Sequence, residues 1–276
     1  MQNVSEEFKT AIASPSPKLK SRIIFPDLVL DDYRVRSINL NSLLVGSEDF
    51  EIGTASMDMV QIELVYAPDE PIEYDFEGKE CEIELGVNIP FTHEYMESFT
   101  YGELEQYTYD ELEEGMPEYV PLGLFTVEKA TKGVMTLTLD CVDRMYKAEK
   151  EYISDLMYPT TLLDILQSAS EQAGIPLATT TFTNSDYIVP NEPVYEGVTC
   201  RKVFAQVAEL AGGYAKINRL GALEIITLGN ESVRDITKDH YFDLKINEVA
   251  EASIDKVIVK VGEETATKGD GENIYF

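Results

Sequence analysis

The stretch PLGLFTV at 121–127 runs through a Lys132-Gly133 turn into LTLDCVDRMY at 137–146. Leu137 and Leu139 alternate with threonines, as expected of a strand that buries one face. A glycine at position 133 is typical of a short hairpin turn that needs a positive φ. The stretch therefore predicts a strand, a hairpin, a second strand and then an exit into a helix.

More strands are expected on the N-terminal side of this hairpin, between Lys20 and Leu139. Turn residues separate short apolar runs there, a pattern typical of a barrel or sandwich. A short helix over residues 4–13 precedes them, with Ser5 as its cap and with Phe8 and Ile12 on one face. The Ser-Pro-Ser-Pro run at 14–17 ends this helix. The strands that we expect are Arg22–Phe25, Tyr33–Asn39, Phe50–Thr54, Met59–Tyr66 and Lys79–Leu85.

The pattern changes to helices after Tyr152. Thr161 and Asp164 resemble a capping box, and Gly174 supplies a helix end. Between them, apolar residues recur at helical spacing at 162, 165, 166, 169 and 173. A second helix is expected from Thr199 to Gly212-Gly213, with Val203, Phe204, Val207 and Ala211 on one face. We also expect a strand at Leu177–Phe182 and a hairpin of Tyr214–Asn218 with Ala222–Thr227, turned at Leu220-Gly221.

The last region returns to strands, Tyr241–Glu248 and Ser253–Val261. Two strands rarely form a stable structure alone. We therefore expect them to pair with the first barrel, to build an incomplete second barrel or to pack against a partner subunit. The fold class is thus α+β, mainly β. We expect three domains: 1–152 with a barrel and an acidic insertion near 90–120, 153–229 with two helices, and 230–276 with the strands of a second, incomplete barrel.

The order of these motifs resembles one family, the baseplate hub proteins at the tail tip of long-tailed bacteriophages and prophages, which includes the N-terminal part of tail-associated lysins and tail endopeptidase-like proteins. The likeness lies in the 121–146 motif, in Ser5-Glu6-Glu7-Phe8 and in the 50–55 run before Ile62-Glu63-Leu64. The helix after Pro159 and the Gly212-Gly213 helix end follow in the same order. Members of this family often continue past a segment like 269–275 into a lytic or receptor-binding region.

The resemblance implies a structural role without enzymatic activity. The chain would form a hub ring, a homotrimer, that closes the tail tube and connects it to distal baseplate components during host attachment and DNA delivery. The barrels would resemble tail-tube modules, with a small helix-containing α+β domain beside them. Two related barrels in each subunit would let three subunits imitate a six-fold tube. The implied partners are the distal tail protein, the tape measure protein and a downstream lytic or receptor-binding component. The location would be the virion tail, after synthesis in the bacterial cytoplasm.

Charge is the second strong feature, with 51 acidic and 22 basic residues and a formal charge of -29. Between Ser37 and Glu128 there are 23 acidic residues and one lysine, Lys79. We interpret Glu80, Glu82 and Glu84 as one solvated strand face, and Glu94–Glu118 as a long Tyr-rich insertion. Stable nucleic-acid binding is not expected, because phosphate contacts need clustered basic residues. An acidic channel wall would instead let DNA slide past.

No catalytic, cofactor or metal residues are predicted. His93 and His240 are the two histidines, and neither lies near a nucleophile motif. The pairs Asp140 with Asp143 and Asp31 with Asp32 could serve a glycosidase, but carboxylate pairs are abundant in so acidic a chain. The clusters Asp270–Asn273 and Asp110–Glu114 lack the spacing of an EF-hand, and phosphate-binding loops are missing.

The three cysteines, Cys81, Cys141 and Cys200, fit neither a disulfide framework nor a zinc site. We expect Cys81 and Cys141 to be small core residues. Residues 1–20 lack the pattern of a signal peptide, and no run approaches the ~20 apolar residues of a membrane span.

Two other functions stay open. A carbohydrate- or cell-surface-binding module of the tail would use the tyrosines of Glu94–Tyr119. A cell-wall hydrolase would need one of the carboxylate pairs in a cleft.

Overall fold

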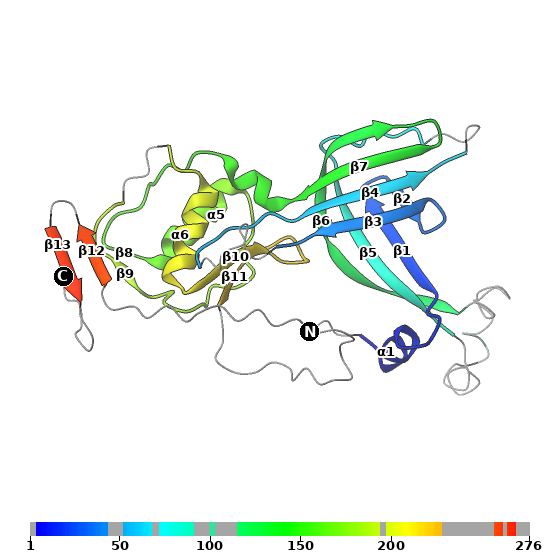
Figure 1. Ribbon diagram of the computed structural model, residues 1–276, viewed down its shortest axis with the longest axis horizontal. Coiled ribbons are helices and arrows are strands. Elements are labelled where there is room, and N and C mark those ends of the chain that lie inside the picture. The colour runs from blue at the N-terminus through cyan, green and yellow to red at the C-terminus, as the bar shows by residue number, and fades with distance from the viewer. Residues whose placement is uncertain are drawn as a thin grey trace. The chain divides into compact units, whose positions relative to one another are not determined.

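A computed structural model describes residues 4–43, 52–67, 72–90, 100, 102, 115–193 and 197–227, and the backbone of 257–261 and 264–268. The chain falls into two units, Met1–Leu228 and Gly229–Phe276. Figure 1 shows the helices and strands of both units. The division into three domains predicted from the sequence stays a prediction.

The first unit contains a seven-stranded antiparallel sheet. Its strand order is β2-β1-β5-β6-β7-β4-β3, so that β2 and β3 are the two edges. The strands are β1 (Leu19–Phe25), β2 (Leu28–Asp31), β3 (Val35–Asn41), β4 (Met59–Val65), β5 (Glu80–Ile89), β6 (Met116–Lys132) and β7 (Thr136–Asp143).

Alternation along the strands creates the core of this sheet. Ile62 and Leu64 on β4, Ile83 on β5, and Leu137 and Leu139 on β7 are almost fully buried. Their neighbours along each strand lie on the opposite face, since successive side chains alternate. Cys81 and Cys141 belong to the same core, which confirms their prediction as small core residues.

The expected barrel is not closed. Within the described residues no hydrogen bonds join the edge strands β2 and β3, although the sheet contains every strand from β1 to β7. The mainly β character is confirmed, and the resemblance to a tail-tube module stays a prediction. β2 was missed because four residues are too few to show a period in the sequence.

The β6–β7 hairpin is confirmed, but its glycine has a different role from the one predicted. Gly133 is absent from the residues with positive φ. A Cβ there would lie 2.6 Å from Thr136 Oγ1, so the turn needs glycine because two chain segments approach closely.

Two predicted strands are wrong. The described part of Phe50–Thr54 lies in bends, and only Ala55 forms an isolated bridge, to Ala215. In the predicted strand Leu177–Phe182, only Leu177 forms a bridge, to Leu223. In the second segment Leu177 and Phe182 are partly buried against the core of the helical region, whereas residues 178–181 between them are exposed. In the first, Ile52 is 45% exposed. A few apolar residues in a short run are thus not enough to specify a strand.

The helical region follows β7 directly. It consists of the 3-10 helix η1 (Arg144–Glu149), the helices α5 (Leu162–Ala173) and α6 (Cys200–Leu210), the short strands β8 (Thr160–Thr161) and β9 (Ile188–Val189), and the hairpin β10 (Gly213–Ile217) with β11 (Leu223–Thr227). Both helices and the β10–β11 hairpin agree with the predictions.

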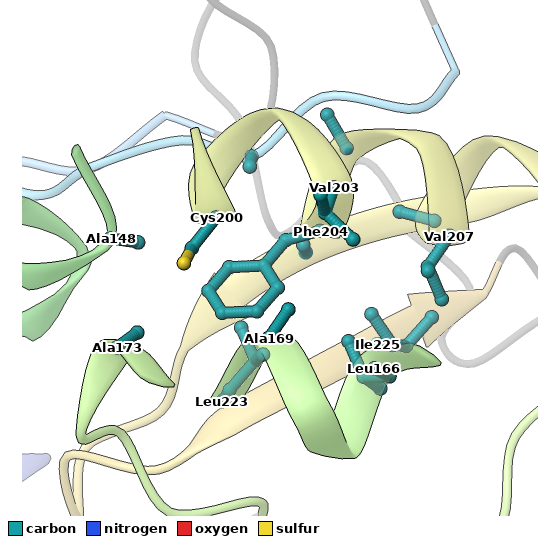
Figure 2. Packing of buried hydrophobic residues seen from close by; sticks show 14 of the residues in the cluster. Ala148, Leu166, Ala169, Ala173, Cys200, Val203, Phe204, Val207, Leu223 and Ile225 are labelled. Atoms are coloured by element: carbon teal, nitrogen blue, oxygen red, sulfur yellow. The ribbon is translucent and has the colours of Figure 1, made fainter. Parts of the chain in front are cut away.

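The ends of α5 also agree with the predictions. Thr161 and Asp164 form a reciprocal capping box, and Gly174 ends the helix with a φ of 67°. The residues predicted for its inner face are buried. Figure 2 shows the ring of Phe204 on α6 pointing toward Ala169 on α5 and Leu223 on β11. Helix α6 thus closes a core that α5 and the hairpin share.

The N-terminal helix α1 (Glu6–Ile12) is capped by Ser5, as predicted. Its buried residues are Phe8 and Ala11, whereas Ile12 is 48% exposed. The predicted pairing of Phe8 with Ile12 is therefore wrong, because the face against Val87 and Ile89 of β5 is one residue offset.

The second unit contains β12 (Val257–Val261) and β13 (Glu264–Lys268), paired antiparallel. The predicted strand Ser253–Val261 agrees with β12 at its C-terminal part. Tyr241–Glu248 lies outside the described residues, so the second barrel stays a prediction. None of the helices in the described part of the chain is long and apolar enough to cross a membrane.

Candidate functional site

A groove lies where the large sheet meets the β10–β11 hairpin. Its volume is about 380 Å³. Leucines from β3 and β6 and isoleucines from β10 and β11 form its apolar wall. Its polar lining consists of Ser42, Asp58, Asp143, Lys216, Asn218, Arg219 and Glu224.

A buried charge cluster lies in this groove. The Lys216 ammonium is 3.2 Å from Asp58 Oδ1 and donates a hydrogen bond to Ser42 Oγ at 2.5 Å. Asp143 accepts hydrogen bonds from the backbone N–H of Asp58 at 2.9 Å and of Met145 at 2.8 Å. The second of these bonds caps η1 at its N-terminus. Asp143 therefore fixes the start of the helical region against the start of β4.

The environment of Asp143 changes its pKa. Burial raises the pKa to about 6, while the two backbone N–H donors lower it, the nearby Asp58 carboxylate raises it and Lys216 lowers it. Burial dominates because only 3% of the residue is exposed. Asp143 therefore takes up a proton in mild acid, at a higher pH than an ordinary aspartate does.

Arg144 joins the sheet to the hairpin. Its guanidinium donates to both carboxylate oxygens of Glu80 on β5, at 2.8 and 2.6 Å, and to the Gly221 carbonyl at 3.1 Å. The Arg144 guanidinium lowers the pKa of Glu80. A bidentate pair fixes both distance and orientation, so Arg144 holds the β10–β11 turn beside the start of β5.

Further contacts come from other segments. Arg219 donates to the Pro121 carbonyl at 3.2 Å, and Arg201 donates to the Ala55 carbonyl at 2.8 Å. Backbone hydrogen bonds join Gly53 to Gly213 and Ala215 to Thr54. Several polar contacts therefore attach the helical region to the sheet, and no single sequence motif predicted them.

The structure places both carboxylate pairs that were considered for hydrolysis. Asp140 and Asp143 are three residues apart on β7, so they point to opposite faces; Asp140 accepts a hydrogen bond from Gln61 on the exposed face. Asp32 pairs with Lys20 at 3.1 Å. Asp31 is its direct neighbour at the end of β2. His93, His240, Asp110–Glu114 and Asp270–Asn273 lie outside the described residues.

The interpretation of β5 as a solvated acidic face needs correction. Glu80 is paired with Arg144, and Glu84 is paired with Arg22 at 2.5 Å. Arg22 also lies over the Tyr119 ring, 4.3 Å from its centroid. The sequence pattern could not show this, because Arg22 comes from β1 and Arg144 from η1.

The cysteines are free and buried. Cys141 and burial raise the pKa of Cys81, and burial raises that of Cys200. Such thiols stay protonated and are poor nucleophiles. Among the described residues, no group of three or more His, Cys, Asp or Glu side chains is placed to hold a metal ion.

Sequence reasoning missed Lys216, Asp58 and the role of Arg144. Arg144 belongs to the LTLDCVDRMY stretch, and its place directly after a buried aspartate was a usable signal. The sequence contained no signal for the role of Lys216, since lysines are common on short strands.

No protein-family model matches the chain, and no curated protein matches it. Among solved structures, the chain is similar to the 43 kDa tail protein of prophage MuSo2 from Shewanella oneidensis, with a TM-score of 0.45 and 12% sequence identity. The match covers 76% of this chain and 55% of that protein, so the chain spans about half of its length. A likeness this weak does not establish a common fold.

Proposed function

We propose that this chain is a structural, non-enzymatic subunit of a phage or prophage tail. In its finer form, the proposal is a tail-tip hub whose copies assemble into a ring, close the tail tube and connect it to distal baseplate components. The ring is a homotrimer, and its neighbours are the distal tail protein and the tape measure protein. The virion tail is then its location.

The observation that carries this proposal is the open edge of β3. β3 ends the strand order, and it is seven residues long. Of its residues Arg36 alone is charged, and it is paired with Glu63 at 3.0 Å. Proteins usually protect a long edge strand with lysines, prolines or a covering segment. Within the described residues, β3 contains no lysine or proline and no further strand pairs with its outer edge. Such an edge is suited to pair with a strand of another copy, and closed rings leave no such edge exposed.

The opposite edge offers a partner of the same kind. β2 is only four residues long, and Val29 on it is 50% exposed. A β2 edge of one copy against a β3 edge of the next would make one continuous sheet across subunits. This contact is head-to-tail, so it closes into a ring when the rotation between copies permits.

The order of motifs along the chain gives the second support. The hairpin of β6 and β7 with the exit into η1 is the part on which the resemblance to tail-tip hub proteins rests. The acidic channel wall belongs to the proposal as well. Because Glu80 and Glu84 are neutralised within the chain, that wall would have to come from other carboxylates of the 37–128 region.

The test is the solution mass of the chain with and without a damaged β3 edge, measured by light scattering after size exclusion. The monomer is 31.0 kDa, so a ring of three copies has about three times that mass. Asn39→Asp with Asn41→Asp adds two charges to exposed residues of β3 with almost no change in shape. Like charges across a pairing edge repel, so this variant is expected to stay a monomer where the native chain assembles.

A charge-matched control separates the edge from net charge. Asn191→Asp with Gln206→Glu adds the same two charges at exposed positions far from β3 in sequence. This control should assemble as the native chain does. A native chain that stays monomeric at physiological salt and with tail partners added would refute the ring. The carbohydrate-binding alternative depends on 94–119, most of which lies outside the described residues.

A further inference from the structure

Four large apolar side chains are exposed around one end of the helix pair α5 and α6. Met157 is 91% exposed, Tyr187 54%, Ile188 53% and Leu210 50%. Single exposed apolar residues are common on protein surfaces, but several in one place mark an interaction site. Their position relative to one another is therefore the deciding observation.

Hydrogen bonds and strand pairing bring the segments that carry these side chains to the same end. The Leu162 N–H at the start of α5 donates to the Tyr187 carbonyl at 2.9 Å, and Thr161 is paired with Ile188 across β8 and β9. Asn184 donates through Nδ2 to the carbonyl of Leu210, the last residue of α6, at 2.8 Å. Met157 comes three residues before β8. We call these four residues the apolar end.

The direction of the helices explains this gathering. In Figure 2 Ala173, at the end of α5, lies near Cys200, at the start of α6, while Leu166 lies near Val207. The two helices are thus antiparallel, and the start of α5 lies beside the end of α6. The segment before α5, residues 184–188 and the end of α6 therefore lie at the same end of the helix pair.

The segments that carry Met157, Tyr187 and Ile188 contain acidic residues and no cationic ones. The sequence from Glu151 to Thr199 contains seven acidic residues and no lysine, arginine or histidine. Asp155, Asp186 and Glu192 are exposed. None of the three has an ion pair within the part of the chain that the structure describes, in contrast to Glu63, Glu80 and Glu84 of the sheet.

We propose that the apolar end is a docking surface for a basic, amphipathic segment of a partner protein. Apolar side chains of that segment would cover the four exposed residues, and its lysines or arginines would meet the acidic rim. This arrangement of an apolar centre with a charged rim is the usual anatomy of a protein interface. The complementary charges would speed the encounter and select the partner.

The same charges argue against other occupants. A second copy would bring the same acidic rim, and the chain as a whole carries a charge of -29. Nucleic acid and anionic membranes are repelled for the same reason. The inference goes beyond the proposed function and does not depend on ring formation, because it concerns the helical region alone.

The test uses a synthetic peptide of lysine and leucine with its leucines at helical spacing, and an isomer of the same composition with the order scrambled. Binding is followed by fluorescence anisotropy of the labelled peptide at physiological salt. Both peptides have the same charge, so a difference between them reports the apolar contact alone. We expect the amphipathic peptide to bind roughly tenfold more tightly than the scrambled one.

Two matched variants locate the contact. Met157→Ser with Ile188→Ser removes two side chains of the apolar end and should abolish the difference between the peptides. Val134→Ser with Met135→Ser removes two apolar side chains that are 89% and 52% exposed at the β6–β7 turn, and should preserve it. Asp155→Asn with Asp186→Asn and Glu192→Gln should weaken both peptides and flatten the salt dependence.

Equal binding of both peptides, or an unchanged difference in the Met157 and Ile188 variant, would overturn the proposal. These outcomes are read at whatever mass the chain has in solution. A failure here is therefore distinct from a failure of ring formation, which the mass of the β3 variant reports.

Discussion

At the scale of single residues, the two side chains that matter most are neighbours in the sequence. Asp143 caps η1 and receives the backbone N–H of Asp58, while Arg144 reaches Glu80 and Gly221. Together they connect the end of β7 to β4, β5 and the β10–β11 turn. The junction between the sheet and the helical region thus depends on a few polar contacts.

The first prediction concerns the pH dependence of stability. The pKa of Asp143 is raised to about 6 in the folded chain, so the folded chain holds a proton more tightly than the unfolded one. Its contribution to stability is fully present below the unfolded pKa of 3.8 and is lost as pH rises through about 6. Relative to Asp143→Asn, the native chain should gain on the order of 2 to 3 kcal/mol between pH 6 and pH 4.

Urea unfolding of both chains at several pH values measures this difference. The comparison with Asp143→Asn is essential, because the many other carboxylates change the stability of both chains alike. A constant difference between the two chains across this range would show that Asp143 titrates normally.

The second prediction concerns Gly221. Its φ is +75°, and an added Cβ would lie 2.7 Å from Arg144 Nη1 and 2.9 Å from Leu124 Cδ1. Gly78 has the same φ of +75°, with nothing within 4 Å of its Cβ position. Gly78→Ala should cost only the backbone term, about 1 kcal/mol, whereas Gly221→Ala should cost about 1 to 3 kcal/mol more because it displaces Arg144. Equal losses in thermal unfolding would mean that the Arg144 contact is easily rearranged.

At the scale of elements, local signals were strongest where the backbone itself requires a particular residue. Helix α5 begins at a capping box and ends at a glycine in the left-handed conformation, and the sequence predicted both. The strands were located by their period, but their neighbours in the sheet were not. β1 lies beside β5 and β4 beside β7, pairings that depend on contacts far apart in the chain.

The third prediction tests the start of α5. Thr161 Oγ1 accepts the Asp164 N–H at 3.1 Å, and the Asp164 carboxylate accepts the Thr161 N–H at 3.1 Å. Thr161→Ala should destabilise the chain by about 1 kcal/mol, since the backbone N–H of Asp164 loses its acceptor. Thr180→Ala, at an exposed position outside any helix, is the control and should be nearly neutral. The free energy of unfolding in urea distinguishes the two variants.

At the scale of the whole molecule, the net negative charge is the property with the largest effect on how copies of the chain meet. A chain with a net charge of -29 repels its own copies, so assembly through the β3 edge has to overcome that repulsion. Salt shortens the range of the repulsion without weakening backbone hydrogen bonds between strands to the same degree. In the proposed ring, the charge would therefore control when copies associate.

The fourth prediction follows from this balance. Assembly of the native chain should increase from low salt to about 0.15 M salt, because the Debye length falls to about 8 Å. Light scattering after size exclusion at both salt concentrations measures the change in mass. A mass that decreases as salt is added would mean that ion pairs between copies, and not strand edges, hold the assembly together.

Much of the fold was predictable from the sequence, and the candidate site was largely not. The hairpin at 121–143, both main helices and the buried cysteines follow from period, caps and small apolar residues. The groove, the Lys216–Asp58–Asp143 cluster and the Arg144 contacts were not predictable, because each combines segments that lie far apart in the sequence, such as 64 residues for Arg144 and Glu80 and 174 for Lys216 and Ser42. The predicted solvated face of Glu80 and Glu84 was wrong for the same reason.

The sequence was enough to indicate most of the helices and strands and the strong negative charge, since helical and strand periods, capping residues and charge counts are local or additive properties. The tertiary structure alone decided the strand order, the open edges, the exposed apolar end and the burial that raises the pKa of Asp143. These depend on which distant segments share a core, and that is set by the packing free energy of the whole chain, which no single stretch contains.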